Sequence, residues 1–161
     1  MRCLVVGAML LLSLGAYGRD MREDAVAGER PLAQSALRLM SSKTATRLEI
    51  LYYPTWILTR TALSPERLEK LSSYRISIRA FQDAKLRDDL ISALERSAVK
   101  TTTQSEADYR WACIFYNADG TRLLTMYFDG FGTKGLINGA PVTSIGPVVK
   151  CLERRCSGLW R

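Results

Sequence analysis

The sequence predicts an α+β fold: a single domain with an antiparallel or mixed β-sheet and about two to three helices packed on one face. Three observations favour it. Residues 74–79 alternate apolar and polar side chains, as strands do, and residues 47–53 place Leu48, Ile50 and Tyr52 on one face of a strand. Residues 108–128 have the pattern of a β-hairpin, and residues 83–98 that of an amphipathic helix. The regular strand–helix alternation of a parallel sheet is missing.

The first half of the domain contains two predicted strands and two predicted helices. Pro31 suits the first turn of a short helix. The strand over residues 47–53 ends at Pro54, which has no N–H for a ladder hydrogen bond. Residues 55–62 are predicted to be extended. Trp56 suits the core or the lining of a cleft, and we expect it to fill the core. Ser64 is a suitable N-cap for a short helix before the strand over residues 74–79.

The second half contains the strongest patterns. Asp83 is a candidate N-cap for the helix over residues 83–98, and residues 101–107 read as a polar connector. The hairpin consists of strands 108–116 and 121–128 around an Asn-Ala-Asp-Gly turn. A glycine-rich turn follows, then a short strand or tight turn near residues 136–142. Gly146 and Pro147 begin a terminal helix.

The N-terminus has the pattern of a secretory signal peptide. Arg2 precedes an apolar stretch, and small residues lie before Arg19. We therefore expect a signal peptide over residues 1–18, an N-terminal extension with a short helix over 19–44, and the α+β domain over 45–161. The mature chain is then exported, periplasmic or secreted, with no stable transmembrane anchor after cleavage, because the apolar stretch is shorter than a membrane span.

Charge indicates the kind of partner. The chain carries a net charge of +7, spread along its length, so we expect an acidic protein partner; export argues against nucleic acid. Arginines on the outer strand faces form a candidate basic plate, and the glycine-rich turn presents two further side chains. These candidate partner-binding residues are Arg75, Arg79, Arg110, Arg122, Phe131 and Lys134. The alternative is a solvated basic face without a partner.

The sequence contains no recognisable catalytic constellation. It has no histidine, which removes the usual base of serine and cysteine hydrolases and a common zinc ligand. Gly130–Gly135 matches G-x-G-x-x-G, but no helix follows to bind a pyrophosphate. We therefore expect no catalytic residue, no cofactor and no metal. Nothing in the pattern sets the oligomeric state.

Three cysteines remain after the leader. We expect a disulfide between Cys151 and Cys156, which would require the last turn of the terminal helix to unwind. Cys113 lies in an aromatic strand and is expected to be a buried thiol; a bridge from Cys113 to the C-terminal segment is the alternative.

The leading hypothesis is a small exported binding protein without enzymatic activity, in its sharpest form an inhibitor or immunity-type protein that occludes a partner in the cell envelope. Two alternatives stay open. One is an envelope glycan hydrolase that uses two of the carboxylates of Glu49, Asp108, Asp119 and Asp129. The other is a structural protein that binds an anionic envelope polymer.

Overall fold

A computed structural model describes residues 31–42, 44–79, 84–104 and 106–159 of the protein. The predicted signal peptide, its cleavage site and the expected helix cap at Asp83 lie outside these residues. In the described part of the chain, no helix has the length and apolar character needed to cross a membrane.

The described residues form a seven-stranded sheet with four helices. A first helix spans residues 31–41. The other elements follow in chain order: β1 (Arg47–Tyr52), α2 (Pro65–Leu71), β2 (Tyr74–Ile78), α3 (Ala84–Glu95), β3 (Lys100–Thr101), β4 (Tyr109–Tyr116), β5 (Arg122–Asp129), β6 (Lys134–Ile137), β7 (Ala140–Thr143), α4 (Gly146–Cys156) and the 3₁₀ turn η1 (Ser157–Leu159).

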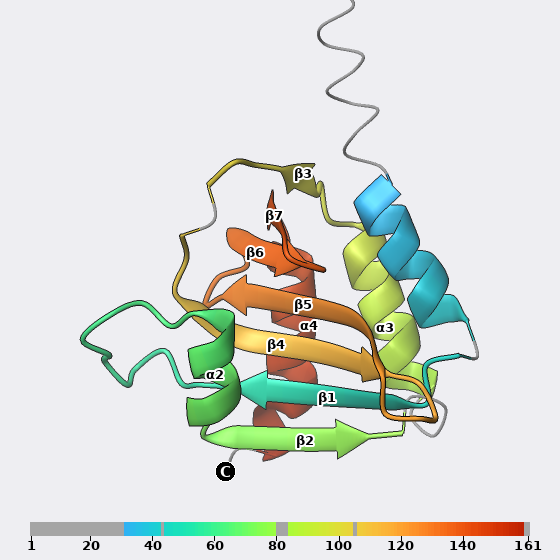
Figure 1. The fold of residues 1–161 in the computed structure, drawn as a ribbon, viewed down its shortest axis with the longest axis horizontal. Helices are drawn as coiled ribbons and strands as arrows, with labels where there is room; N and C mark the ends of the chain where they lie inside the picture. Colours follow the sequence, from blue (N-terminus) through green and yellow to red (C-terminus); the bar gives the residue numbers. More distant parts are fainter. Residues whose placement is uncertain (1–30, 43, 80–83, 105, 160–161) are drawn as a thin grey trace, which may run out of the picture.

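The strands lie in the order β2-β1-β4-β5-β6-β7-β3 (Figure 1). Every pair of neighbours is antiparallel, so the α+β prediction is confirmed in its antiparallel form. The β4–β5 hairpin occupies the middle of the sheet, and Asn117 closes its turn by accepting from the Thr121 N–H at 2.8 Å. The sheet is therefore built from local hairpins, extended by β1 and β2 on one side and by β3 on the other.

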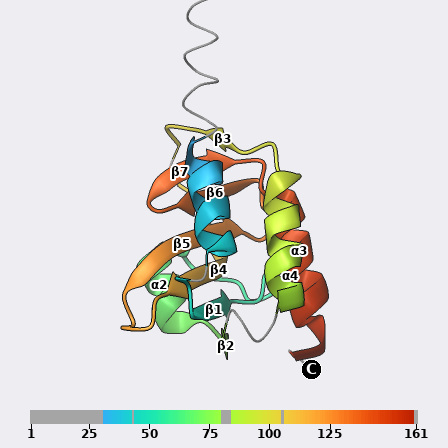
Figure 2. The same cartoon turned by 90° about the vertical axis from the view of Figure 1, so that its right-hand side faces the viewer.

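The longer helices cover one face of the sheet, as predicted, and one short helix covers the other. Helices α3 and α4 lie on the first side, where the helix over residues 31–41 also packs, and α2 lies on the opposite side (Figure 2). The larger core contains Leu90 of α3 and Leu152 of α4 against Trp111 and Phe115. Leu68 of α2 packs on the opposite face with Ile114. As a result, all eight residues of β4 are buried.

Three segments differ from their predictions. Residues 55–62 form an irregular loop and not an extended strand. The polar connector begins with β3, which pairs with β7. Residues 134–143 form a complete hairpin, whose turn residues Asn138 and Gly139 both have positive φ, as a tight two-residue hairpin turn requires. The first helix buries Ala36 and Met40 in the main core, so it belongs to the same globular unit as residues 45–159.

Gly132 lies where two backbones come into close contact. It has a φ of +69°, and a Cβ built on it would lie 2.7 Å from the Cα of Gly146. Its carbonyl accepts a hydrogen bond from the Ile145 N–H at 2.8 Å. This contact fixes the turn after β5 against the start of α4. A side chain of any size at residue 132 would separate them.

Gly132→Ala should therefore destabilise the protein more than Gly120→Ala. Gly120 also has a positive φ, of +81°, but a Cβ added to it would have nothing within 4 Å. We expect a loss of about 1 kcal/mol in the free energy of unfolding for Gly120→Ala, from backbone strain alone. Gly132→Ala adds a backbone clash and should lose about 3 kcal/mol. Urea denaturation measures both; equal losses would contradict the close contact.

Candidate functional site

Two neighbouring loops lie together at one end of the sheet. One spans residues 53–62, between β1 and α2, and the other spans residues 130–133, between β5 and β6. They touch, because a Cβ on Gly130 would lie 2.6 Å from the Cγ2 of Thr55. Both loops project from the same side of the sheet in Figure 1. We call this region the loop end.

The loop end exposes large apolar side chains. Trp56 is 69% exposed, Leu58 92% and Phe131 79%, and Ile57 is also exposed. The prediction that Trp56 fills the core is therefore wrong; its ring meets the edge of Tyr52, with the ring centroids 6.3 Å apart. Single exposed apolar residues are ordinary, but several carried on adjoining loops are a candidate binding surface.

A buried arginine holds the first loop in place. Arg110 is only 6% exposed, and its Nη1 donates to the carbonyls of Pro54 at 3.1 Å and Ile57 at 3.0 Å. Its Nε donates to Asp108 Oδ2 at 2.8 Å. The other oxygen of Asp108 accepts from the Leu63 N–H at 2.9 Å. Together, Arg110 and Asp108 tie both ends of the loop to the start of β4.

A single carboxylate organises the second loop. Asp129 Oδ1 accepts from the N–H groups of Phe131 at 3.1 Å and Thr133 at 2.9 Å. Its Oδ2 accepts from the Lys134 N–H at 3.1 Å and from the Thr133 hydroxyl. Such side-chain to backbone hydrogen bonds define an Asx-type turn. The exposed Phe131 is therefore carried on a loop with a fixed backbone.

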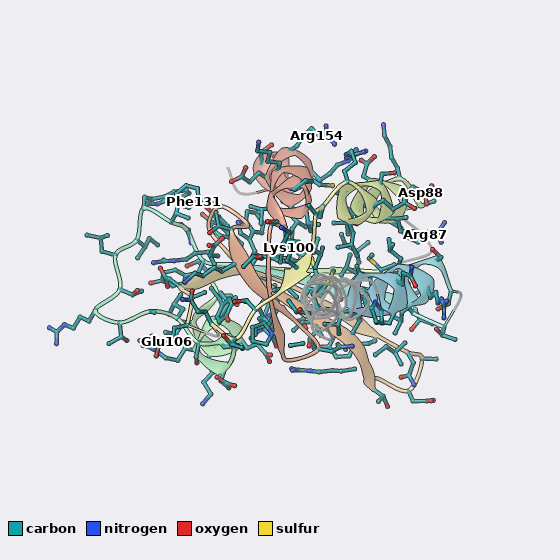
Figure 3. The ribbon with its side chains drawn as sticks, turned by 90° about the horizontal axis from the view of Figure 1, so that it is seen from above. Arg87, Asp88, Lys100, Glu106, Phe131 and Arg154 are labelled. Atoms are coloured by element: carbon teal, nitrogen blue, oxygen red, sulfur yellow. The ribbon has the colours of Figure 1, made fainter. Side chains whose placement is uncertain are left out.

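A cleft of about 390 Å³ lies between the two loops. Its lining includes Thr55, Asp108, Arg110, Asp129, Phe131 and Lys134. Figure 3 shows Phe131 and Glu106, which also lines the cleft, on the same side of the molecule. Lys134 Nζ lies 3.3 Å from the backbone carbonyl of Glu106, to which it donates. The cleft thus has an aromatic wall and a polar floor.

The structure separates the six predicted partner-binding residues. Phe131 and Lys134 belong to the loop end. Arg110 is buried, which contradicts its predicted place on an outward strand face. The register of β4 against β5 shifts between Tyr109 and Trp111, and a bulge of this kind re-aims the extra residue.

The other three arginines lie away from the loop end. Arg79 follows β2 and is exposed. Arg75 Nη1 donates to Glu49 Oε1 at 2.7 Å, and Tyr116 donates to Glu49 Oε2 at 2.8 Å. Arg122 makes a bidentate pair with Glu69, at 2.9 and 2.6 Å. Arg75 and Arg122 are thus neutralised within the chain, so the predicted basic plate is not formed.

Glu69 is the centre of these interactions. Partial burial by itself would raise its pKa, but hydrogen bonds from Arg122 and Tyr127 outweigh that effect and hold the pKa below its usual value. Burial and the bond to Glu69 in turn raise the pKa of Tyr127. The folded state therefore favours the ionised form of Glu69.

The three described cysteines are free and buried. The predicted Cys151–Cys156 disulfide is absent, because α4 remains helical through Cys156 and residues five apart on a helix point in different directions. Cys113 is a fully buried thiol, as expected. Burial raises the pKa of Cys113 well above its usual value and that of Cys156 to about 11. These thiols are poor nucleophiles.

The carboxylates of the hydrolase alternative have structural partners. Asp108 and Asp129 do line one cleft, but their oxygens accept the hydrogen bonds that hold the two loops. Glu49 is paired with Arg75, and Asp119 accepts from Asn117 in the hairpin turn. Within the described residues, no group of three or more metal-ligating side chains is placed to hold an ion.

No protein-family model matches the chain, and neither the curated proteins nor the solved structures include a significant match. A function for this chain therefore has to be inferred from its own residues, above all those of the loop end. Sequence reasoning identified Phe131 and Lys134 but missed Trp56 and Leu58. The available signal was Pro54, which ends the strand just before an apolar triplet that lacks strand alternation.

Arg110→Gln should loosen the loop end. The substitution leaves Asp108 without its cation and two loop carbonyls without their donor, so we expect a loss of about 2–3 kcal/mol in the free energy of unfolding. Limited proteolysis should then cut within residues 53–62 faster than in the wild type. Arg122→Gln is the control: its pair is half-exposed, and its loss should be about 1 kcal/mol, with no change at the loop.

Glu69→Gln should destabilise the protein in a pH-dependent way. Because the folded-state pKa of Glu69 lies below its ordinary value of 4.5, the carboxylate contributes stability that is fully present above pH 4.5. That contribution is lost as the pH falls through the folded-state pKa. We expect a difference of about 1 kcal/mol at pH 7 that shrinks in acid. Urea unfolding across pH, with the exposed Glu95→Gln as control, measures it; a difference independent of pH would contradict the assignment.

Proposed function

We propose that this chain is an exported, non-enzymatic binding protein that docks an acidic protein partner through the loop end. The observation that carries the proposal is the set of apolar side chains exposed there, Trp56, Leu58 and Phe131. Tryptophan is among the residues most enriched in binding hot spots, and aromatic residues are enriched in interface cores. Most of the surface of these three side chains lies in water, although the Trp56 ring also contacts Tyr52.

The hydrogen bonds that hold the two loops support a binding role for their exposed apolar side chains. Arg110 and Asp108 hold the first loop at Pro54, Ile57 and Leu63, and Asp129 holds the second loop from Phe131 to Lys134. Because the backbone of both loops is held at these points before an encounter, less conformational entropy is lost on association. The exposed aromatic groups are then presented in a preorganised arrangement. That arrangement suits a lock-and-key contact with a folded partner.

Charge supports an acidic partner. The chain carries +7 overall, and Arg60 adds an exposed cation within the loop end. A positive protein attracts an acidic one over several ångströms and accelerates their encounter, more so at low salt. Occlusion of an enzyme by an inhibitor or immunity-type protein requires this complementarity of shape and charge, and no reactive group. The chain fits that description.

The hydrolase alternative makes a different prediction for the same cleft. If Asp108 and Asp129 cleave a glycan, Asp→Asn at either residue abolishes turnover, whereas Trp56→Ala leaves some turnover. Under the binding proposal no turnover exists to be lost. Assaying the full mature chain on cell-wall material, with both Asp variants, separates these two functions. Retention on that material without cleavage would favour the third alternative, an anionic polymer.

Trp56→Ala combined with Phe131→Ala should abolish partner binding without unfolding the protein. Both side chains are mostly exposed, so we expect less than about 0.5 kcal/mol loss of stability. Each hot-spot truncation costs about 2 kcal/mol, or about thirtyfold in affinity, so the two together should weaken binding by about a thousandfold. Leu71→Ala, which removes an exposed apolar side chain elsewhere, is the matched control and should bind normally.

The partner is captured with a photo-crosslinking amino acid in place of Phe131, and with the same group at Asp119 of the distant hairpin turn as control. The captured protein is then purified, and its affinity for each variant is measured at low and high salt. A 1:1 complex that is lost in the double Ala variant supports the proposal. Equal crosslinking from residues 119 and 131, equal binding by the double Ala variant, or no partner at all would overturn it.

A further inference from the structure

The cleft between the end of α3 and the start of α4 has an unusual lining. It measures about 280 Å³, and it is lined by Arg96, Gly146, Pro147, Lys150, Cys151 and Arg154. Three of these six side chains are cations and none is a carboxylate. Small-molecule pockets usually exceed about 300 Å³ and are mainly apolar. This cleft is smaller and strongly basic, which suits a small anion better than an organic ligand.

The three cations have no carboxylate partner among the described residues. The ion pairs on this side of the molecule are Arg155–Asp89 and Arg87–Asp88. Arg155 Nε lies 2.6 Å from Asp89 Oδ2, so this carboxylate of α3 already has a cation as its partner. The pKa of Asp89 is held below its usual value by that bond. Arg96, Lys150 and Arg154 are all exposed at the cleft.

The arrangement has a cost that a ligand would offset. Like charges gathered around one cleft repel each other, and the carboxylate whose charge reaches Arg154, that of Asp89, is already bound to Arg155. Arg154 is close enough to the Cys151 thiol to oppose the burial that raises the pKa of that thiol. Figure 3 shows Arg154 on the outer side of α4. An anion that enters the cleft would be in contact with solvent-accessible cations from two helices at once.

We propose that Arg96, Lys150 and Arg154 form a binding site for a phosphate-class oxyanion between α3 and α4. A tetrahedral oxyanion offers several acceptors, and arginine and lysine are the side chains that bind phosphoryl oxygens by charge-assisted hydrogen bonds. Gly146 and Pro147 have no long side chains to block the approach from the side of α4. This site is separate from the proposed partner surface and does not depend on it.

The test uses the full mature chain and inorganic phosphate as the probe. Titration followed by ¹H–¹⁵N NMR should give saturable shifts confined to residues around 96 and 146–154. In Arg96→Gln/Lys150→Gln/Arg154→Gln, affinity should fall at least about tenfold, because three charge-assisted contacts are lost. Without phosphate at low salt, this variant should be as stable as the wild type or more so. A large loss of stability would mean that the cations are structural and would overturn the proposal.

Arg60→Gln/Lys70→Gln/Arg79→Gln is the charge-matched control. It removes the same net charge at exposed residues outside the cleft, so it should bind phosphate normally. Equal weakening in both triple variants would indicate a diffuse charge effect and would overturn the site.

A second arm identifies the source of the phosphoryl group. Vesicles of phosphatidylglycerol, with phosphatidylcholine vesicles as the neutral comparison, test a lipid headgroup. Binding to free phosphate, or to the anionic vesicles alone, supports the site if the triple variant of the cleft loses this binding and the charge-matched triple variant keeps it. Binding to neither probe overturns it. Trp56→Ala/Phe131→Ala should bind both probes as the wild type does, so this result is independent of the protein partner.

Discussion

Much of this structure depends on the burial of β4 on both faces. Its eight residues are all buried, since α3 and α4 cover one side of the sheet and α2 covers the other. A charged side chain at the start of such a strand cannot be left without partners, because an unpaired buried charge is very costly. Arg110 meets this constraint by binding Asp108 and two carbonyls of the first loop. The hydrogen bonds that satisfy the buried Arg110 also hold the backbone of the first loop, which carries the exposed Trp56 and Leu58.

The charges on the α2 side illustrate how a basic composition can mislead about surfaces. Arg75 and Arg122 bind Glu49 and Glu69, and two tyrosine hydroxyls complete the coordination of those carboxylates. This network attaches α2 and the edge strand β2 to the middle of the sheet. Its cations act within the fold, so the positive charge left for other molecules lies elsewhere: on Arg60 and Lys134 around the loop end, and on the outer side of α3 and α4. Charged side chains without an internal partner are therefore a better guide to a binding surface on this protein than the frequency of arginine in its sequence.

The sequence is sufficient for the elements whose signals are local. The β4–β5 hairpin follows from alternating aromatic strands around an Asn-Ala-Asp-Gly turn, and α3 follows from its apolar stripe. The sequence is not sufficient where tertiary contacts decide. Continued alternation places Arg110 on an outer face, but the bulge at that residue breaks the alternation. The size and apolar character of Trp56 favour the core, yet the core is already filled by Trp111 and its neighbours. The exposure of Phe131 can be predicted from the sequence, because a glycine-rich turn offers few side chains to cover a phenylalanine. The partner of each arginine cannot be predicted in this way, because it depends on the order of the strands, which no local pattern contains.

The three buried thiols have a consequence for how the chain reaches this state. Cys151 and Cys156 lie on α4, the last helix in the described chain, and Cys113 lies on the strand that α4 helps to cover. In an oxidising compartment, such as the sequence predicts, every thiol of a nascent chain is open to oxidation until α4 docks. Because α4 follows all seven strands along the chain, it docks only after the described sheet has been synthesised. The thiols therefore stay reduced only if α4 packs against the sheet faster than they are oxidised.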